Sequence, residues 1–166
     1  MMIDVRRFAK WEWVENWNSK RGPCPLSEFD KFSKHVKSSS NKRIFEKPVF
    51  EILMDQRYFN GIGNYLRAEI LHRLNVNPFL PAYKVVSDDL LEMCHDVCQE
   101  SYLVGGGELK DWDNPFKRGY ARGRINKKML KVAETDFRDW LQCYGKMASV
   151  EDSKGRRFWF DKKWSN

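Results

Sequence analysis

The pattern of apolar positions divides the chain into a β-like start, a long helical middle and a β-like end. In residues 1–24, apolar and aromatic side chains alternate as they do along a strand, until an Arg-Gly-Pro sequence interrupts the pattern. After Pro25 the spacing becomes helical, with Phe29, Phe32 and Val36 on one stripe. This order predicts a mainly α chain with small β parts.

Helix start signals recur through the middle of the chain. Pro48 suits the first turn of a helix, a second helix is expected to begin near Asn64, and Ser87 can cap a third helix. Thr135 can cap a last short helix. The segment 149–160 alternates around a Ser-Lys-Gly turn, which predicts a β-hairpin.

A glycine-rich turn, residues 59–64, separates two of the expected helices, and we call it the glycine bend. Gly61 and Gly63 let the backbone turn and approach a ligand closely. The helix that begins at Asn64 presents unpaired N–H groups and its positive dipole end to this bend, which suits one phosphate. An ordinary helical hairpin with a glycine turn explains the spacing equally well.

The charge is uneven along the chain. The net charge is +7, and residues 117–131 contain seven basic residues and no acidic one. A focused block of this kind favours a polyanionic partner, because each neutralised phosphate releases counterions. A solvated, mobile loop is the alternative interpretation.

No membrane partner is expected. No apolar run approaches the roughly 18 residues that a membrane span needs, and the first twenty residues contain no apolar stretch of the signal-peptide type. A cytosolic or nuclear setting follows from this interpretation.

The cysteine and histidine spacing predicts neither a metal site nor a disulfide. The four cysteines form no Cys-x-x-Cys pair, and the three histidines do not have ligand spacing. Cys94 and Cys98 lie one helical turn apart, but no second pair is available to face them. Buried, inert thiols are the prediction, and no cofactor is implied.

The segment Asp55–Leu71 resembles the helix–two-turn–helix motif of the formamidopyrimidine-DNA glycosylase and endonuclease VIII family. The resemblance implies that the amides of Gly61, Ile62 and Gly63, together with Asn64, bind a backbone phosphate beside a lesion. It extends from the Asp-Gln before the bend to the Glu and Leu after it.

Near the start of the chain, Asp4-Val5-Arg6-Arg7-Phe8 resembles the void-filling loop of this family. A base taken out of the stack leaves a hole, and a guanidinium and a flat ring inserted there recover part of the unstacking energy. The resemblance implies that Arg6 and Phe8 are the inserted pair and that Arg7 contacts a phosphate. A strand with two exposed arginines is the alternative.

Near the end of the chain, residues 137–145 and the hairpin 152–160 resemble the finger of the family. In most members four cysteines bind zinc in this finger, and these cysteines are absent here. Aromatic residues at 158–160 stand where packing must replace the metal. This pattern is similar to the zincless finger of the animal endonuclease VIII-like type.

The resemblance also assigns basic residues to DNA contacts. It gives Arg156, in preference to Arg157, the role of reaching phosphates next to the flipped nucleotide. Lys117 and Arg118 fall where family members have a mobile loop that closes over the extruded base.

The residues that perform the chemistry in this family are not found in the chain. Family members attack C1′ with the α-amine of an N-terminal proline, which a glutamate follows. Here the first residues are Met-Met-Ile, so no catalytic residue is assigned and no glycosylase activity is expected of the chain alone. We expect the end of a truncated catalytic β-sandwich domain in 1–24, a helix–two-turn–helix DNA-binding domain in 25–134 and a zincless finger in 135–166.

The expected function is damaged-DNA binding in base-excision repair, as the C-terminal part of a bifunctional DNA glycosylase and AP lyase that removes oxidised bases. The expected partner is double-stranded DNA with a damaged base or an abasic site, bound by a monomer in the nucleus. A non-enzymatic nucleic-acid-binding module is the alternative, since certain ribosomal proteins contain a similar motif. A lysine-dependent helix–hairpin–helix glycosylase is a third interpretation, but Asn64-Tyr65-Leu66-Arg67 lacks the lysine that it needs.

Overall fold

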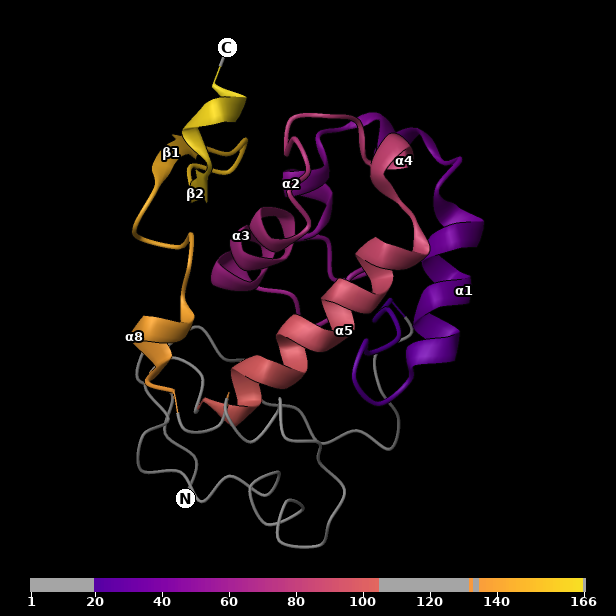
Figure 1. Ribbon diagram of the computed structural model, residues 1–166. Coiled ribbons are helices and arrows are strands. Elements are labelled where there is room, and N and C mark those ends of the chain that lie inside the picture. Colours follow the sequence, from indigo (N-terminus) through magenta and orange to yellow (C-terminus); the bar gives the residue numbers. More distant parts are fainter. Residues whose placement is uncertain (1–19, 105–131, 133–134, 166) are drawn as a thin grey trace, which may run out of the picture.

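The structure is a computed structural model, and it describes residues 20–104, 132 and 135–165. The predicted mainly α chain with a C-terminal β-hairpin is confirmed (Figure 1). The predicted β-like start and the basic block at 117–131 lie outside the described residues. Within the described ranges, no helix combines the length and the apolar character needed to cross a membrane.

Three longer helices form the body of the described part, and short helical turns connect them. The longer helices are α1 (Phe29–Ser39), α3 (Asn64–Arg73) and α5 (Asp88–Leu103). The shorter turns are η1 (Arg43–Glu46), α2 (Val49–Ile52), α4 (Ala82–Val85), α8 (Phe137–Trp140) and η2 (Lys162–Trp164).

Helix caps explain where several of these helices begin. The Ser87 hydroxyl accepts the N–H of Leu90 at 3.3 Å, so the predicted cap of α5 is confirmed. The prediction that Thr135 caps the last short helix is wrong. Asp136 directly precedes α8 and its carboxylate accepts the N–H of Arg138 at 2.8 Å, because a side-chain oxygen at this position reaches the free amides of the first turn.

Helix α3 lies at the centre of the described fold. It packs on α5, on the second strand of the hairpin and on α2, as Figure 1 shows. Six consecutive residues of α3, from Leu66 to Leu71, are buried, and two of them, Arg67 and Glu69, are charged. Buried charges are rare unless they are paired, so both must have partners in the neighbouring segments.

The C-terminal hairpin consists of β1 (Ala148–Glu151) and β2 (Arg157–Phe160). The strands are antiparallel, and Val150 lies opposite Phe158. The turn between them contains Gly155 at φ +70°, a conformation that favours glycine. Phe158 has no exposed surface and its ring stacks on Phe50, with 4.7 Å between the ring centroids. An aromatic contact therefore joins the hairpin to α2.

We expect Phe158→Ala to lower the free energy of unfolding by about 3–5 kcal/mol, because it removes a fully buried ring and leaves a cavity. Urea denaturation followed by circular dichroism measures the change. The matched control is Val150→Ala, since Val150 lies opposite Phe158 but is 38% exposed. The control should change the free energy of unfolding by less than about 1 kcal/mol. Equal losses in the two variants would contradict the role of Phe158 as the apolar anchor.

Candidate nucleic-acid interface

The glycine bend connects α2 to α3 at the surface of the molecule. Phe59 and Ile62 have no exposed surface and anchor the bend in the core. Between them, Gly61 is exposed at φ +86°. Among the residues that the structure describes, a Cβ atom placed on Gly61 or Gly63 would meet nothing within 4 Å. The outer side of the bend is therefore open to a ligand, and its inner side is packed.

The side chain of Gln56 shapes the bend from within. Its Oε1 accepts the N–H of Gly61 at 2.8 Å, and its Nε2 donates to the carbonyl of Ile62 at 3.0 Å. The N–H of Ile62 donates to the carbonyl of Phe59 at 3.2 Å. Two of the four amides that the sequence suggested for phosphate binding, those of Gly61 and Ile62, thus have acceptors inside the bend.

The two following amides are free. None of the hydrogen bonds among the described residues uses the backbone N–H of Gly63 or Asn64. These two N–H groups lie at the N-terminal end of α3, and the first turn of α3 contains no acidic residue. The positive end of the helix dipole is consequently not neutralised by its own helix, which favours an anion at this point.

Asn64 connects the bend to the hairpin through its carboxamide. Its Nδ2 donates to the carbonyl of Arg157 at 2.9 Å, and its Oδ1 accepts from Nε of Arg67 at 2.9 Å. The residue is half-buried. The amide therefore joins the first turn of α3 to the first residue of β2.

A buried ion pair joins α3 to the hairpin more deeply. Arg67 Nη1 lies 3.0 Å from Asp152 Oδ2, and neither side chain has exposed surface. Nη1 also donates to the carbonyl of Phe50 at 3.1 Å. Nη2 is buried with no acceptor among the described residues, but the guanidinium lies over the rings of Phe158 and Phe50 at 5.1 and 5.7 Å. These ring faces attract the cation and offset part of the desolvation.

Asp152 also holds the predicted phosphate-binding arginine of the hairpin. Its Oδ1 accepts the backbone N–H groups of Lys154 and Arg156, both at 2.9 Å, and its Oδ2 accepts Nε of Arg156 at 2.8 Å. Burial alone would raise the pKa of Asp152, but these hydrogen bonds and that from Arg67 lower it to about 2. The carboxylate is therefore ionised at neutral pH.

Arg156 is held at one end and open at the other. Its side chain is 36% exposed, and none of the hydrogen bonds among the described residues uses its Nη1 or Nη2. Lys154 and Arg157, on either side of it, are exposed. Arg156 thus belongs to one continuous network with Asn64, through Arg67 and Asp152, and its terminal N–H groups can receive a ligand.

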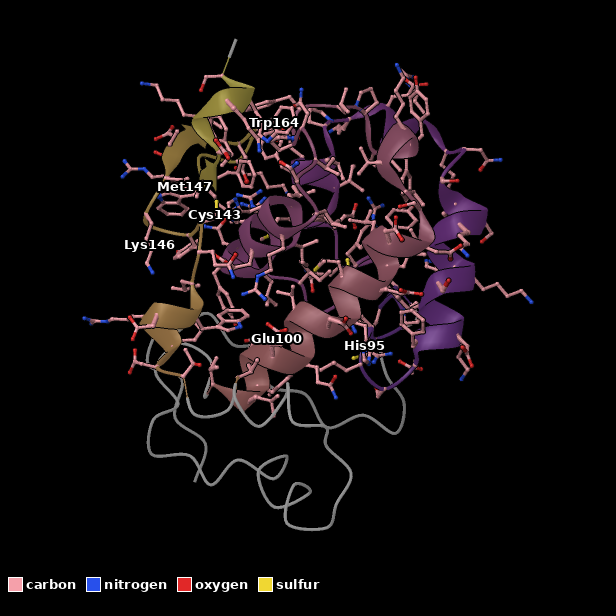
Figure 2. The ribbon with its side chains drawn as sticks, viewed as in Figure 1. His95, Glu100, Cys143, Lys146, Met147 and Trp164 are labelled. Carbon is pink, nitrogen blue, oxygen red and sulfur yellow. The ribbon has the colours of Figure 1, made fainter. Side chains whose placement is uncertain are left out.

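The second buried charge of α3 serves the segment that leads into the hairpin. Both carboxylate oxygens of Glu69 accept backbone N–H groups, those of Gln142, Cys143 and Tyr144, each at 2.9 Å. Figure 2 shows Cys143 on this link, between α8 and β1. Helix α3 consequently holds the hairpin from two sides, through Arg67 and through Glu69.

The structure places only some of the predicted site residues. Asn64 and Arg156 are brought into one hydrogen-bonded network, with Gly63 directly before Asn64, whereas Gly61 and Ile62 form the bend itself. The remaining predicted residues lie outside the described residues: Arg6, Arg7, Phe8, Lys117 and Arg118. Their DNA contacts stay predictions.

Sequence reasoning did not identify Gln56 as the side chain that braces the bend, or Arg67 and Asp152 as parts of this network. Arg67 and Asp152 are 85 positions apart, so no local pattern pairs them. The sequence contained one signal for buried charges: Arg67 and Glu69 stand among apolar residues in the helix that begins at Asn64. Two charges in such a helix indicate buried partners elsewhere in the chain.

The thiols of the described residues show no metal-binding arrangement. In the described ranges, no group of three Cys, His, Asp or Glu side chains could hold a metal ion. The four cysteines are free, and three of them are buried. Burial raises the pKa of Cys98 and Cys143 to about 12, so these thiols stay protonated at neutral pH and are poor ligands.

Comparison with known proteins finds a family model and relatives to which this sequence is similar. A family model described as Endonuclease VIII-like 1, DNA bind, matches residues 135–163. Endonuclease 8-like 1 of Homo sapiens is 37% identical over 95% of this chain, which covers 43% of that protein. The chain therefore spans less than half the length of this curated relative.

Two solved structures share the fold. The MutM (Fpg) protein of Thermus thermophilus superposes with a TM-score of 0.61 at 21% identity, over 87% of this chain and 53% of that one. The Lactococcus lactis Fpg, in a complex with DNA that contains an abasic site, superposes with a TM-score of 0.59 at 19% identity, over 87% of this chain and 51% of that one.

The low pKa of Asp152 predicts a loss of stability in acid. Because folding lowers this pKa from 3.8 to about 2, the ionised carboxylate stabilises the fold above pH 4, and that stabilisation is lost as the pH falls toward 2. Between pH 6 and pH 3 this group should account for about 1 kcal/mol of the free energy of unfolding. The wild type should lose that much more than Asp152→Asn in urea titrations at the two pH values. A carboxyl NMR titration of the wild type, with a midpoint near 4 for Asp152, would contradict the prediction.

Proposed function

Because this chain belongs to the formamidopyrimidine-DNA glycosylase and endonuclease VIII family, we propose that it binds double-stranded DNA containing a damaged base or an abasic site, in base-excision repair. The description of the matching family model names DNA binding, and one of the superposed structures is a complex with DNA that contains an abasic site. The chain covers only part of these proteins. Binding is therefore the activity that we propose for the chain, as a helix–two-turn–helix domain with a zincless finger.

One observation carries the proposal: free backbone amides and a free guanidinium end lie on one hydrogen-bonded network. The N–H groups of Gly63 and Asn64 lie at the start of α3, and the side chain of Asn64 is linked to Arg156 through Arg67 and Asp152. Backbone N–H groups at a helix start bind one phosphate oxygen, and an arginine binds a phosphate with two parallel hydrogen bonds. Both groups of donors therefore suit phosphate oxygens.

The remaining roles are proposals for residues outside the described ranges. Arg6 and Phe8 fill the space left by the flipped nucleotide, Arg7 contacts a phosphate, and Lys117 and Arg118 belong to a loop over the extruded base. These roles agree with the basic excess of the chain, whose net charge is +7.

The proposed setting is a longer bifunctional DNA glycosylase and AP lyase that removes oxidised bases, acting as a monomer in the nucleus. In that setting the described residues hold DNA and perform no chemical step. The proposed divisions of the chain are 1–24, 25–134 and 135–166, for the end of a β-sandwich, the DNA-binding domain and the finger.

Competition binding distinguishes repair from a general nucleic-acid-binding role. A fluorescent duplex with an abasic-site analogue is displaced with the unlabelled analogue duplex, with undamaged duplex and with structured RNA. Preference for the abasic-site duplex supports the proposal. Equal displacement by RNA would favour the non-enzymatic RNA-binding alternative.

We expect Arg156→Ala to weaken binding to the abasic-site duplex by about 1–3 kcal/mol, the scale of a hydrogen bond between charged groups. The slope of log K against log salt should also fall by roughly 1, because one phosphate contact is lost. The matched control is Arg43→Ala, an exposed arginine on η1, which packs on α2 and α4. An unchanged affinity and slope for Arg156→Ala would remove Arg156 from the interface.

A further inference from the structure

The carboxamide of Asn64 has two chemically different ends, and only one of them suits a phosphate. The NH2 group donates hydrogen bonds and the oxygen accepts them, so a rotation by 180° exchanges a donor for an acceptor. A phosphate is an anion and needs the donor. The usefulness of Asn64 at the glycine bend therefore depends on which end faces outward.

The structure fixes this orientation from two directions. Arg67 Nε donates to Oδ1 of Asn64 on the part-buried side, and Nδ2 of Asn64 donates to the carbonyl of Arg157 on the exposed side. In the rotated amide, a donor would face a donor at Arg67 and an oxygen would face an oxygen at Arg157. Nδ2 carries a second N–H, for which the described residues provide no acceptor.

We propose that Arg67 is a positioning residue that holds the Asn64 carboxamide with its NH2 group toward the phosphate at the glycine bend. This inference rests on the proposed DNA-binding function. Arg67 itself has no exposed surface, so it acts through Asn64 and does not contact DNA.

An arginine suits this task because its donors are rigidly arranged. The guanidinium presents its N–H groups in a fixed planar fork. Nη1 is held by Asp152 and by the carbonyl of Phe50, and this sets the direction of Nε toward Asn64. A lysine in the same place would keep the charge opposite Asp152, but it lacks the second, fixed donor.

The test is a double-mutant cycle on affinity for the abasic-site duplex. Arg67→Lys keeps a cation beside Asp152 and removes the Nε donor. We expect it to weaken binding about tenfold in the otherwise unchanged chain, and by less than about twofold in the Asn64→Ala background, because the effect passes through Asn64.

The matched control is Arg73→Lys. Arg73 also lies on α3, is 13% exposed, pairs with Glu100 and lies over the Trp140 ring at 4.6 Å. It therefore resembles Arg67 in its low exposure, its ion pair and its aromatic contact, but its partners are Glu100 on α5, Trp140 on α8 and, at 3.6 Å, Glu69 on α3, and none of the hydrogen bonds among the described residues joins them to Asn64. Arg73→Lys should leave the affinity unchanged in both backgrounds.

The outcomes separate this inference from the function on which it rests. If the unsubstituted chain does not bind the duplex, the proposed function is wrong, and this role with it. If the chain binds and Asn64→Ala weakens binding, while Arg67→Lys has no effect or the same effect in both backgrounds, only the positioning role is wrong.

A measurement on the unsubstituted chain decides the question if Arg67→Lys does not fold. In 15N relaxation experiments, the side-chain amide of Asn64 should be as rigid as the backbone amides of α3. The Arg67 Nε–H should also exchange slowly with solvent. A freely rotating Asn64 amide would overturn the proposal, whatever the affinity of the variants.

Discussion

The buried ion pair between Arg67 and Asp152 is the contact on which the rest of the described structure depends. Taking two charges out of water is unfavourable by several kcal/mol per ion, so such a pair needs further contacts to its remaining donors and acceptors. Here the Asp152 carboxylate accepts four hydrogen bonds, and the guanidinium, whose Nη2 has no acceptor among the described residues, lies over two aromatic rings that offset part of its desolvation. Removing one partner would leave an uncompensated charge in the interior, at a cost of about 3–5 kcal/mol. The pair therefore fixes where the hairpin lies more strictly than apolar contact alone would.

The ion pair has this effect because α3 is surrounded by other segments. Successive residues of an α-helix turn by about 100°, so Arg67 and Glu69 point to nearly opposite sides of α3. Arg67 reaches the hairpin turn, and Glu69 accepts three consecutive amides of the segment that precedes the hairpin. Helix α3 thus binds both the hairpin turn and the segment before the hairpin with charges, while Phe158 and Phe50 supply the apolar contact. The first turn of the same helix remains free to face a ligand.

Local patterns predicted the longer helices and the hairpin of this fold, but not the contacts between them. The spacing of Phe29, Phe32 and Val36 predicted α1, and Ser87 predicted the start of α5, because both signals lie within a few residues of the element that they mark. The bend and the start of α3 at Asn64 were predicted for the same reason. The buried roles of Arg67 and Glu69 were not predicted. The partner of Arg67 lies 85 positions away, and the partners of Glu69 lie 73 to 75 positions away. A charged residue looks the same in a sequence whether it faces water or a distant carboxylate. The sequence predicted the glycine bend, but it did not predict that the Gln56 side chain accepts the Gly61 N–H.

A hairpin of this size needs support from outside itself. Segments below about 40 residues rarely bury enough apolar surface to fold alone, and disulfides or metal ions usually provide the missing stability. In the described residues, α3 provides it, through a helix that also carries the glycine bend. Asn64 and Arg67 lie one turn apart on the same face of α3, and Asp152 connects that face to Arg156. The spacing between the free amides of the bend and the guanidinium of the hairpin is therefore set by one helical turn and one carboxylate. A stabilising contact within the hairpin would stabilise the hairpin equally well. It would not fix the distance between the amides of the bend and the guanidinium of Arg156. Placing the support on α3 ties the stability of the hairpin to the geometry of the proposed phosphate contacts.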